Sequence, residues 1–329
     1  MIKAAMGRFL SPGLAIDLGT DNTLMYIKGR GIVLDEPSVL AVQTSTGEVL
    51  AVGHEAKEML GRTPRGVEAI KPLHGGVVSS LWATERMLQH FVSRVRSGWS
   101  LPGGNAVIGV PGDCTSVERR AVQQAAGAAR LQNVELVEEV LAAAIGAGLP
   151  IDEPCGRMVI DMGAGTTDIA VISLGGIVAS NALRVGGNDL DDAIVQYVKR
   201  RHRLLIGEPT GERIKIEIGS ACDIPGPDSV VVTGRGLADG LPHKLKVTAE
   251  EVREAIAKPV ADVVRAVMYA LERTPPELSA DIYDSGLVLT GGGSLLRGMV
   301  ERLEGETGLP VTRVDDPLSS VVLGTGRML

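Results

Sequence analysis

The sequence carries one short pattern twice, and this repeat is the strongest constraint on the fold. The stretch AIDLGTDNTLMYI lies near the start of the chain, and VIDMGAGTTDIAVI lies about midway. Each is an apolar run that ends in Ile-Asp, then a turn rich in glycine and threonine, then a second apolar run. Such a pattern predicts a strand–turn–strand unit. Asp17 and Asp161 hold equivalent places in the two copies, which indicates a duplicated architecture.

Helical patterns follow each copy. Amphipathic helices are predicted at residues 84–97, 116–131, 188–205 and 210–221. A long helical region begins at Thr248, which forms a capping box with Glu251, and Pro259 is expected to break or kink it. The last clear unit, at residues 285–308, is a buried strand, a triple-glycine turn and a helix. Strands alternate with helices in both halves, so we expect two α/β domains with mixed sheets.

Composition limits the classes of protein to which the chain can belong. Its 329 residues suffice for two domains with substantial cores. A net charge of −7 without any basic run argues against a nucleic-acid partner. No apolar stretch reaches the roughly 18 residues that span a bilayer, and the start lacks a signal-peptide core, so a cytoplasmic location is predicted. Cys114, Cys155 and Cys222 show no metal-ligand spacing and are expected to be buried free thiols.

The two turns are candidate phosphate-binding loops. Glycine lets the backbone approach a phosphate closely, and consecutive N–H groups form an anion-binding nest. The candidate residues are Gly19, Thr20, Asn22, Gly163, Gly165, Thr166 and Thr167, with a further hydroxyl on Thr23. Neither turn contains Lys or Arg, so the charge of a polyphosphate must be offset in another way. Asp17 and Asp161 together can hold Mg²⁺ through its retained waters.

The alternative for each turn is a β-hairpin without a ligand, and two matched copies favour a site. Other nucleotide and catalytic signatures are missing from the sequence. It contains no G-x-x-x-x-G-K-[ST] and no G-x-G-x-x-G, which argues against a P-loop or a dinucleotide-binding turn. It also contains no H-E-x-x-H and no G-x-S-x-G, so metalloprotease and serine-hydrolase functions have no support.

The two hairpins and the late segment LTGGGSLLRG resemble the actin-like ATPase superfamily. Within it the chain is similar to the MreB family of bacterial actins over nearly its whole length. The segments that carry this resemblance include LDEPSVLAV, VERRAV, EEVLAAAIGAGLP, VGGNDLDDAIVQYV, ERIKIEIGSA and PPELSADI. The resemblance implies an actin-like (ribonuclease H-like) duplicated α/β fold, with a nucleotide cleft between two domains.

The resemblance also implies domain boundaries. Domain I would span residues 1–145, with a core of 1–30 and 75–145 and a small insertion at 31–74. Domain II would span residues 146–329, with a core of 146–178 and 246–318 and a small insertion at 179–245. The last segment, 319–329, would return toward domain I.

Site residues follow from the matching motifs. Asp17 and Asp161 would frame Mg²⁺, and Glu139 would act with Asp161 in catalysis by orienting the attacking water. The residues implied to contact adenosine are Glu212, Lys215, Ile216, Gly291, Gly292 and Gly293. The alternatives are an ordinary first-turn glutamate at position 139, a surface ion pair of Glu212 with Lys215 beside a core Ile216, and a purely structural glycine turn.

The chain departs from the family pattern at three places near these motifs. Asp21 stands where the family usually has Ala, and Val140-Leu141 stands where it usually has Pro-Met. Ala164 replaces the middle residue of a glycine triplet. These departures keep open a divergent paralogue that binds nucleotide without hydrolysing it.

Two segments are candidates for membrane contact. On a helical wheel, Ile2, Met6, Phe9 and Leu10 share one face of the first ten residues. Trp99 and Leu101 lie in a Gly/Pro loop. The alternatives are a disordered start and a loop packed on its own core, whereas the resemblance implies attachment to the inner membrane face. It also places Val117 on a helix that pairs two protofilaments.

The sequence therefore predicts a filament-forming ATPase that organises cell-wall synthesis and rod shape. Its cofactors would be ATP and Mg²⁺, and hydrolysis would be slow and coupled to polymerisation. Its partners would be further copies of itself, the inner membrane surface and membrane-bound elongation proteins such as a RodZ-like adaptor, with no nucleic acid. The rival function is a small-molecule kinase of the same superfamily, which would need a catalytic base for its acceptor.

Overall fold

A computed structural model describes residues 13–96 and 105–329 of the chain. The chain divides into two compact units. Unit 1 comprises Met1–Ile151 together with Leu318–Leu329, and unit 2 comprises Asp152–Pro317. The C-terminal segment therefore belongs to the same compact unit as the first half of the chain. The predicted domain and insertion boundaries stay predictions.

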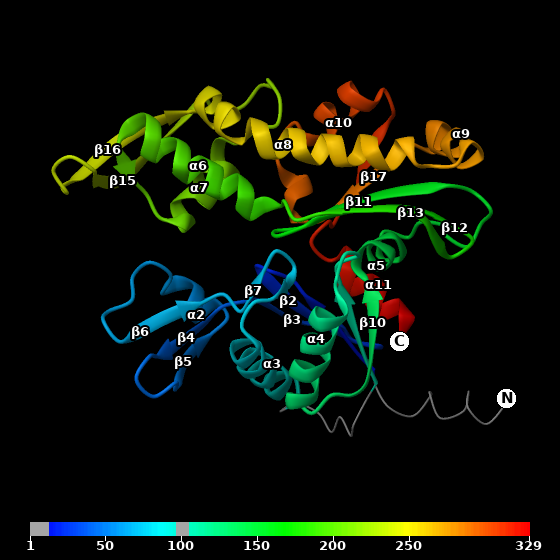
Figure 1. Cartoon of the computed structure of the whole chain (residues 1–329), viewed down its shortest axis with the longest axis horizontal. Helices are drawn as coiled ribbons and strands as arrows, with labels where there is room; N and C mark the ends of the chain where they lie inside the picture. Colours follow the sequence, from blue (N-terminus) through cyan, green and yellow to red (C-terminus); the bar gives the residue numbers. More distant parts are fainter. Residues whose placement is uncertain (1–12, 97–104) are drawn as a thin grey trace. The chain divides into compact units, whose positions relative to one another are not determined.

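Unit 1 contains a five-stranded mixed sheet in the order β10-β9-β1-β2-β3. Figure 1 labels β2, β3 and β10 of this sheet. Its strands are β1 (Leu14–Leu18), β2 (Asn22–Ile27), β3 (Gly31–Pro37), β9 (Asn105–Val110) and β10 (Gln132–Glu138). The first three strands are antiparallel, and β9 and β10 run parallel to β1. The predicted first hairpin is confirmed, with Leu14 opposite Ile27 and Leu18 opposite Thr23.

Unit 2 repeats this sheet, in the order β13-β12-β11-β17-β18. Its strands are β11 (Arg157–Met162), β12 (Thr167–Ser173), β13 (Gly176–Leu183), β17 (Leu287–Thr290) and β18 (Val311–Arg313). Again three antiparallel strands are followed by two that run parallel to the first. The predicted second hairpin and the duplicated, mixed-sheet architecture are confirmed.

Burial on both faces explains why the hairpin strands read as continuous apolar runs. In β1, Leu14, Ala15, Ile16 and Leu18 are all buried, and β12 is buried from Thr167 to Ile172. A strand that is covered on both sides has no solvent face on which to alternate polar residues. Each sheet therefore lies within the hydrophobic core of its own unit.

The helices of unit 1 cover its main sheet. They are α3 (Leu81–Arg96), α4 (Ser116–Ala128), α5 (Glu139–Gly146) and α11 (Ser320–Met328). Leu88, Phe91 and Val92 of α3 are buried, in agreement with the amphipathic helix predicted at residues 84–97. The helices α5 and α11 cross with almost no space between their backbones. A side chain at Gly146 would overlap Ser320, and one at Gly324 would overlap Ala142, so both positions require glycine.

A second, smaller set of elements completes unit 1. It comprises β4 (Leu40–Gln43), β5 (Val49–Val52), α2 (His54–Glu58), β6 (Val67–Ile70), β7 (Leu73–His74) and β8 (Val77–Val78). Glu36 of β3 links it to α3, because its carboxylate accepts from the His54 amide at 3.0 Å and from Arg94 Nη1 at 2.6 Å. Burial alone would raise the pKa of Glu36, but these hydrogen bonds and the Arg94 charge outweigh it and lower the pKa.

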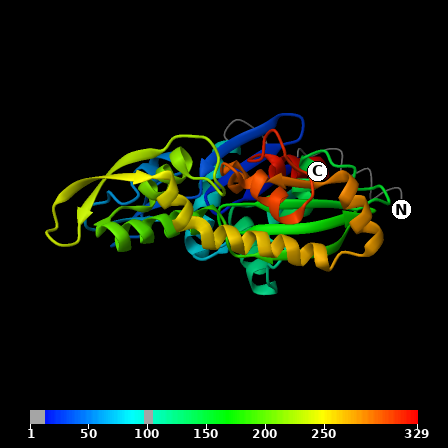
Figure 2. The ribbon, with the colours of Figure 1, turned by 90° about the horizontal axis from the view of Figure 1, so that it is seen from above.

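Unit 2 carries its own small sheet and a long helix. The elements are α6 (Gly187–His202), β14 (Leu204–Leu205), α7 (Glu208–Ile218), β15 (Ser229–Gly236), β16 (Pro242–Thr248), α8 (Ala249–Glu272), α9 (Pro276–Ser285), η2 (Gly292–Leu295) and α10 (Met299–Thr307). Figure 2 shows α8 extending along much of this unit. The predicted capping box is confirmed: Glu251 N donates to Thr248 Oγ1, and Glu251 Oε2 accepts from the Thr248 amide.

Of the predicted break or kink at Pro259, the break is wrong, because α8 is one helix from Ala249 to Glu272 with Pro259 inside it; a kink stays a prediction. Proline removes one backbone donor and crowds the preceding turn. Ile256, Val260 and Val263 are buried on both sides of it, and this packing holds the helix together across the defect.

Two further features of the sequence can be compared with the structure: its cysteines and its apolar helices. All three cysteines are free, but only Cys114 is buried, and Cys155 and Cys222 are partly exposed. Within residues 13–96 and 105–329, no helix is long and apolar enough to cross a membrane.

We expect Glu36→Gln to lower the free energy of unfolding by about 1–2 kcal/mol at neutral pH, because it removes the carboxylate charge from a partly buried hydrogen bond with Arg94. The pKa of Glu36 is lowered in the folded state, so its stabilisation is present above the unfolded pKa and is lost as the pH falls through the folded value. Urea denaturation followed by tryptophan fluorescence at several pH values would measure this.

Glu48→Gln is the matched control, since Glu48 is exposed between β4 and β5, and we expect it to change the unfolding free energy by less than about 0.5 kcal/mol. If Glu36→Gln matched this control at pH 7, the link between β3, α2 and α3 would contribute nothing.

Candidate functional site

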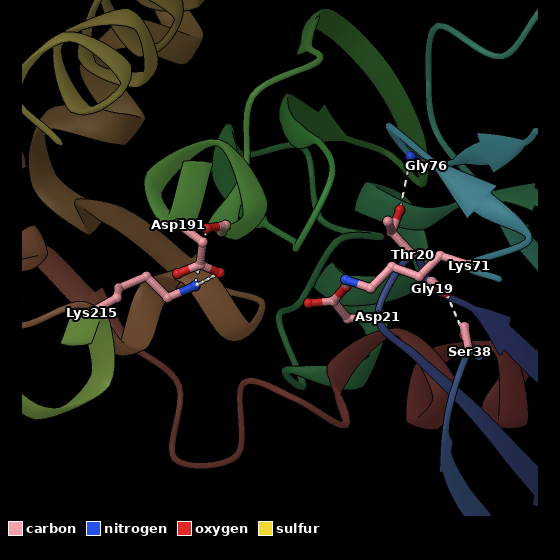
Figure 3. A network of polar contacts seen from close by, with 9 residues as sticks. Gly19, Thr20, Asp21, Ser38, Lys71, Gly76, Asp191 and Lys215 are labelled. Atoms are coloured by element: carbon pink, nitrogen blue, oxygen red, sulfur yellow. Dashed lines mark hydrogen bonds and ion pairs between the residues drawn. The ribbon is translucent and has the colours of Figure 1, made fainter. Parts of the chain in front are cut away.

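The first hairpin turn, residues 19–22, is held by the chain that follows β3. Ser38 Oγ donates to the carbonyl of Gly19 at 2.7 Å, and the Ser38 amide donates to the carbonyl of Asp21 at 2.8 Å (Figure 3). Gly19 has no room for a side chain, because a Cβ would lie 2.6 Å from the carbonyl oxygen of Asn22. The turn therefore presents a tightly folded backbone, as a phosphate-binding loop requires.

The two threonines of this stretch have different roles. Thr20 Oγ1 accepts from the Gly76 amide at 2.9 Å, which leaves its own proton to donate to a ligand. Thr23 is fully buried, 2.9 Å from Ser38 Oγ. Ser38 gives its single proton to Gly19, so Thr23 must donate to Ser38. The Thr23 hydroxyl therefore stabilises the turn, and its role as a phosphate donor stays a prediction.

Asp17 lies on β1, one residue before the end of the strand. Burial, and to a lesser extent the charge of Asp35, raises the pKa of Asp17 to about 7. Such a carboxyl is readily ionised when a cation approaches, because a nearby positive charge favours its charged form. Asp17 is thus suited to a site whose charge changes on ligand binding.

The second hairpin turn, residues 163–166, is held by the start of α6. The Gly163 amide donates to the carbonyl of Thr166 at 2.8 Å, which closes the turn. The Gly187 and Asn188 amides donate to the carbonyls of Gly163 and Ala164, at 3.0 and 2.8 Å. First-turn amides of a helix have no partner within the helix, and here the turn supplies it.

Thr167 follows this turn and is fully buried. Its hydroxyl donates to the carbonyl of Val185 at 2.8 Å. This bond uses the hydroxyl proton inside unit 2, and the phosphate contact of Thr167 stays a prediction. Thr166, Gly163 and Gly165 remain candidates within the turn itself.

The triple-glycine turn packs directly on Asp161. Gly291 has a φ of 78°, and a Cβ there would lie 2.5 Å from Asp161 Oδ1. A Cβ on Gly293 would lie 2.9 Å from the carbonyl of Met162. Only glycine fits both the conformation and the space. Gly292 begins a short 3₁₀ helix, and α10 follows at Met299, so the predicted order of strand, glycine turn and helix is confirmed.

The predicted adenosine residues of α7 have different surroundings in the structure. Lys215 Nζ lies 2.8 Å from Asp191 Oδ2 and donates to the carbonyl of Gly187 at 3.0 Å (Figure 3). It is therefore linked through α6 to the second turn. Ile216 is 68% exposed while Ile214 is buried, so the alternative of a core Ile216 is wrong. Glu212 is half-buried on the same helix.

Glu139 is the first residue of α5 and is half-buried. Its Cγ would lie 3.1 Å from a Cβ at Gly109 of β9, so the Glu139 side chain packs closely against the backbone of Gly109. Glu138 occupies the N-cap without a side-chain capping bond. Val140 is buried, and the helix therefore begins normally without the proline that the family pattern usually has.

Unit 2 thus brings together Asp161, the second turn, the glycine turn and Lys215, and unit 1 holds Asp17, the first turn and Glu139. No group of three or more His, Cys, Asp or Glu side chains that could hold a metal occurs within the described residues.

Sequence reasoning missed four residues of these networks: Ser38, Lys71, Gly76 and Asp191. Lys71 Nζ lies 3.2 Å from Asp21 Oδ1. Each lies far along the chain from the residue that it contacts, and no local pattern signals such a pairing. Ser38 and Asp191 each lie within a segment that carries the family resemblance, which was the only signal available.

The remaining predicted residues concern surfaces. Val117 is 73% exposed on α4, as an interface residue must be before assembly. The predicted membrane residues Ile2, Met6, Phe9, Leu10, Trp99 and Leu101 lie outside the described residues.

The chain is similar to known proteins over nearly its whole length. The model of the family described as MreB/Mbl protein matches residues 11–329. The chain is 50% identical over 336 aligned residues to the cell shape-determining protein MreB of Escherichia coli (strain K12), and the alignment covers 100% of this chain and 96% of that protein.

Two solved structures extend the comparison to the fold. The crystal structure of MreB5 of Spiroplasma citri bound to ADP matches with a TM-score of 0.92 at 34% identity, covering 97% of this chain and 96% of that one. The MamK double helical filament matches with a TM-score of 0.79 at 25% identity, covering 96% and 98%. The predicted actin-like fold is confirmed.

We expect Gly291→Ala to lower the free energy of unfolding by about 2–4 kcal/mol, because a side chain there meets both a positive φ and the Asp161 carboxylate. Gly305→Ala in α10 is the control, since nothing lies within 4 Å of its Cβ position, and it should be neutral or stabilising by up to about 1 kcal/mol. Chemical denaturation of both variants makes the comparison, and equal stability would contradict the close approach.

Proposed function

Because the chain belongs to the MreB/Mbl family, we propose that it is an ATP-binding cytoskeletal protein that forms filaments and determines cell shape. The observation that carries the proposal is the pair of matched hairpins, each with an aspartate one residue before the end of its first strand. The relative bound to ADP and the relative that forms a double helical filament support nucleotide binding and self-association.

The two hairpin turns would bind the phosphates of ATP. In unit 1 the candidates are Gly19, Asn22 and the Thr20 hydroxyl, whose proton is not used by Gly76. In unit 2 they are Gly163, Gly165 and Thr166, with Thr167 limited to its backbone. Their turns are held by bonds to other parts of their own unit, so little ordering is needed when a ligand binds, which favours affinity.

Asp17 and Asp161 would hold Mg²⁺, largely through water. Bound Mg²⁺ would offset phosphate charge that no Lys or Arg within the turns can offset. Asp17, with its raised pKa, would give up its proton on binding the cation. Glu139 would orient the attacking water, so that the protein acts as a slow ATPase whose turnover is coupled to polymerisation.

The adenosine end would lie against unit 2. Gly291, Gly292 and Gly293 leave the backbone free of side chains beside Asp161, and Glu212, Lys215 and Ile216 are neighbours on α7. Asp191 fixes the Lys215 ammonium, so its position would be set before nucleotide binds. The exposed Ile216 offers an apolar surface for the base.

Assembly would join copies of the chain into paired protofilaments, with Val117 at their interface. We further propose that the filament lies on the inner membrane face through Ile2, Met6, Phe9, Leu10, Trp99 and Leu101. There it would work with cell-wall elongation proteins such as a RodZ-like adaptor, as a cytoplasmic, peripheral protein. Domain I (1–145) and domain II (146–329) would be its moving parts.

Asp161→Ala should abolish sedimentation of the purified chain with Mg-ATP, whereas the wild type should pellet with Mg-ATP more than with Mg-ADP or without nucleotide. Glu306→Ala removes one exposed carboxylate of α10 and should pellet like the wild type. Failure of the wild type to pellet despite bound ATP would contradict the filament and favour a small-molecule kinase.

Membrane binding should depend on the apolar face of the N-terminal segment. Phe9→Asp should reduce co-sedimentation with anionic vesicles at least about tenfold, because each buried apolar side chain contributes roughly 1.5–3 kcal/mol and the filament adds such contacts as avidity. Ala4→Asp adds the same charge on the opposite side of the wheel and is the control. Equal losses for both would show that only charge matters.

A further inference from the structure

The phosphate-binding turns lack a cation of their own, and the fold supplies one from elsewhere in the sequence. No Lys or Arg occurs at residues 17–23 or 161–168. Lys71, which follows β6, places its Nζ 3.2 Å from Oδ1 of Asp21 in the first turn (Figure 3). This brings a positive charge to the turn that the proposed function assigns to the phosphates.

The backbone that carries Lys71 is well anchored. The carbonyl of the next residue, Pro72, accepts from the Ser79 and Ser80 amides at 3.0 and 3.2 Å. Farther along the same loop, the Gly76 amide donates to Thr20 Oγ1. The loop is therefore fixed against the first turn at the residue next to Asp21. The long Lys71 side chain is the part that can change partner.

The Lys71–Asp21 pair is exposed enough to exchange. The side chains of Lys71 and Asp21 are 24% and 27% exposed. Ion pairs that remain in contact with water contribute little, because solvent screens them and the side chains lose entropy. A triphosphate carries several negative charges and accepts charge-assisted hydrogen bonds from an ammonium group. It would therefore compete successfully with one carboxylate for Lys71.

We propose that Lys71 is a phosphate ligand of the nucleotide site and that Asp21 is its internal competitor. This inference rests on the proposed nucleotide binding. With no nucleotide, Asp21 neutralises Lys71 and keeps it at the turn. When the phosphates bind beside Gly19 and Thr20, Lys71 moves from the Asp21 carboxylate to a phosphate oxygen. Asp21 therefore weakens nucleotide binding and Lys71 strengthens it.

The test is a double-mutant cycle with two substitutions that conserve size. The dissociation constant of AMPPNP with Mg²⁺ would be measured by calorimetry for the full chain and for Asp21→Asn, Lys71→Met and the double variant. We expect Asp21→Asn to tighten binding about five- to tenfold and Lys71→Met to weaken it by about the same factor, as for one charge contact. In the Lys71→Met background, Asp21→Asn should have a much smaller effect.

The proposal would be overturned if both single variants shifted the dissociation constant of AMPPNP in the same direction. A pair with a merely structural role would give that result, because removing either partner would destabilise the site in the same way. An equal effect of Asp21→Asn in both backgrounds would also overturn it, since Asp21 would then act by repulsion alone. Glu306→Gln removes one exposed carboxylate from α10 and controls for net charge, and thermal melting confirms that each variant folds. If the wild type bound no AMPPNP, the proposed nucleotide site itself would fail.

Discussion

The close backbone packing around the second hairpin turn is the constraint on which unit 2 depends. The carbonyls of Gly163 and Ala164 accept the first amides of α6, and a Cβ at Gly186 would lie 2.6 Å from the Ala164 carbonyl oxygen. On the other side, a Cβ at Gly291 would lie 2.4 Å from the carbonyl oxygen of Met162. Sheet, helix and glycine turn are therefore fixed by contacts between main-chain atoms. This arrangement also sets the position of Lys215, because its ammonium group binds a carbonyl and a carboxylate of α6.

Unit 1 has the same strand order and directions but holds its turn differently. Here Ser38 and Thr20 make the decisive bonds through hydroxyl groups, to the carbonyl of Gly19 and the amide of Gly76. Both partners outside the turn belong to segments around the small sheet, not to a helix N-terminus. The duplicated sheet thus carries one turn supported by a helix and one supported by loops. A change in the conformation of the first turn would directly affect the segment from Lys71 to Gly76.

Sequence patterns predicted what depends on neighbouring residues and missed what depends on distant ones. The two hairpins and the capping box of α8 are local, since a few adjacent residues determine them. The break at Pro259 was wrong because buried Ile256 and Val260 outweigh the local penalty. The partners of the Thr23 and Thr167 hydroxyls, Ser38 and Val185, were not predicted, because they are distant in sequence. The family resemblance supplied the actin-like fold, which periodicity alone would not have specified.

The two Lys–Asp pairs differ in burial, and burial decides what each can do. Asp191 is 2% exposed, so separating it from Lys215 would leave an uncompensated charge in the interior, which is strongly unfavourable. That pair is suited to fixing a position. Asp21 and Lys71 remain in contact with water, so each can be solvated when they separate, and the pair is suited to exchange. A polyphosphate arriving at the first turn would therefore find a cation that it can recruit, whereas Lys215 would keep the same partner with and without ligand.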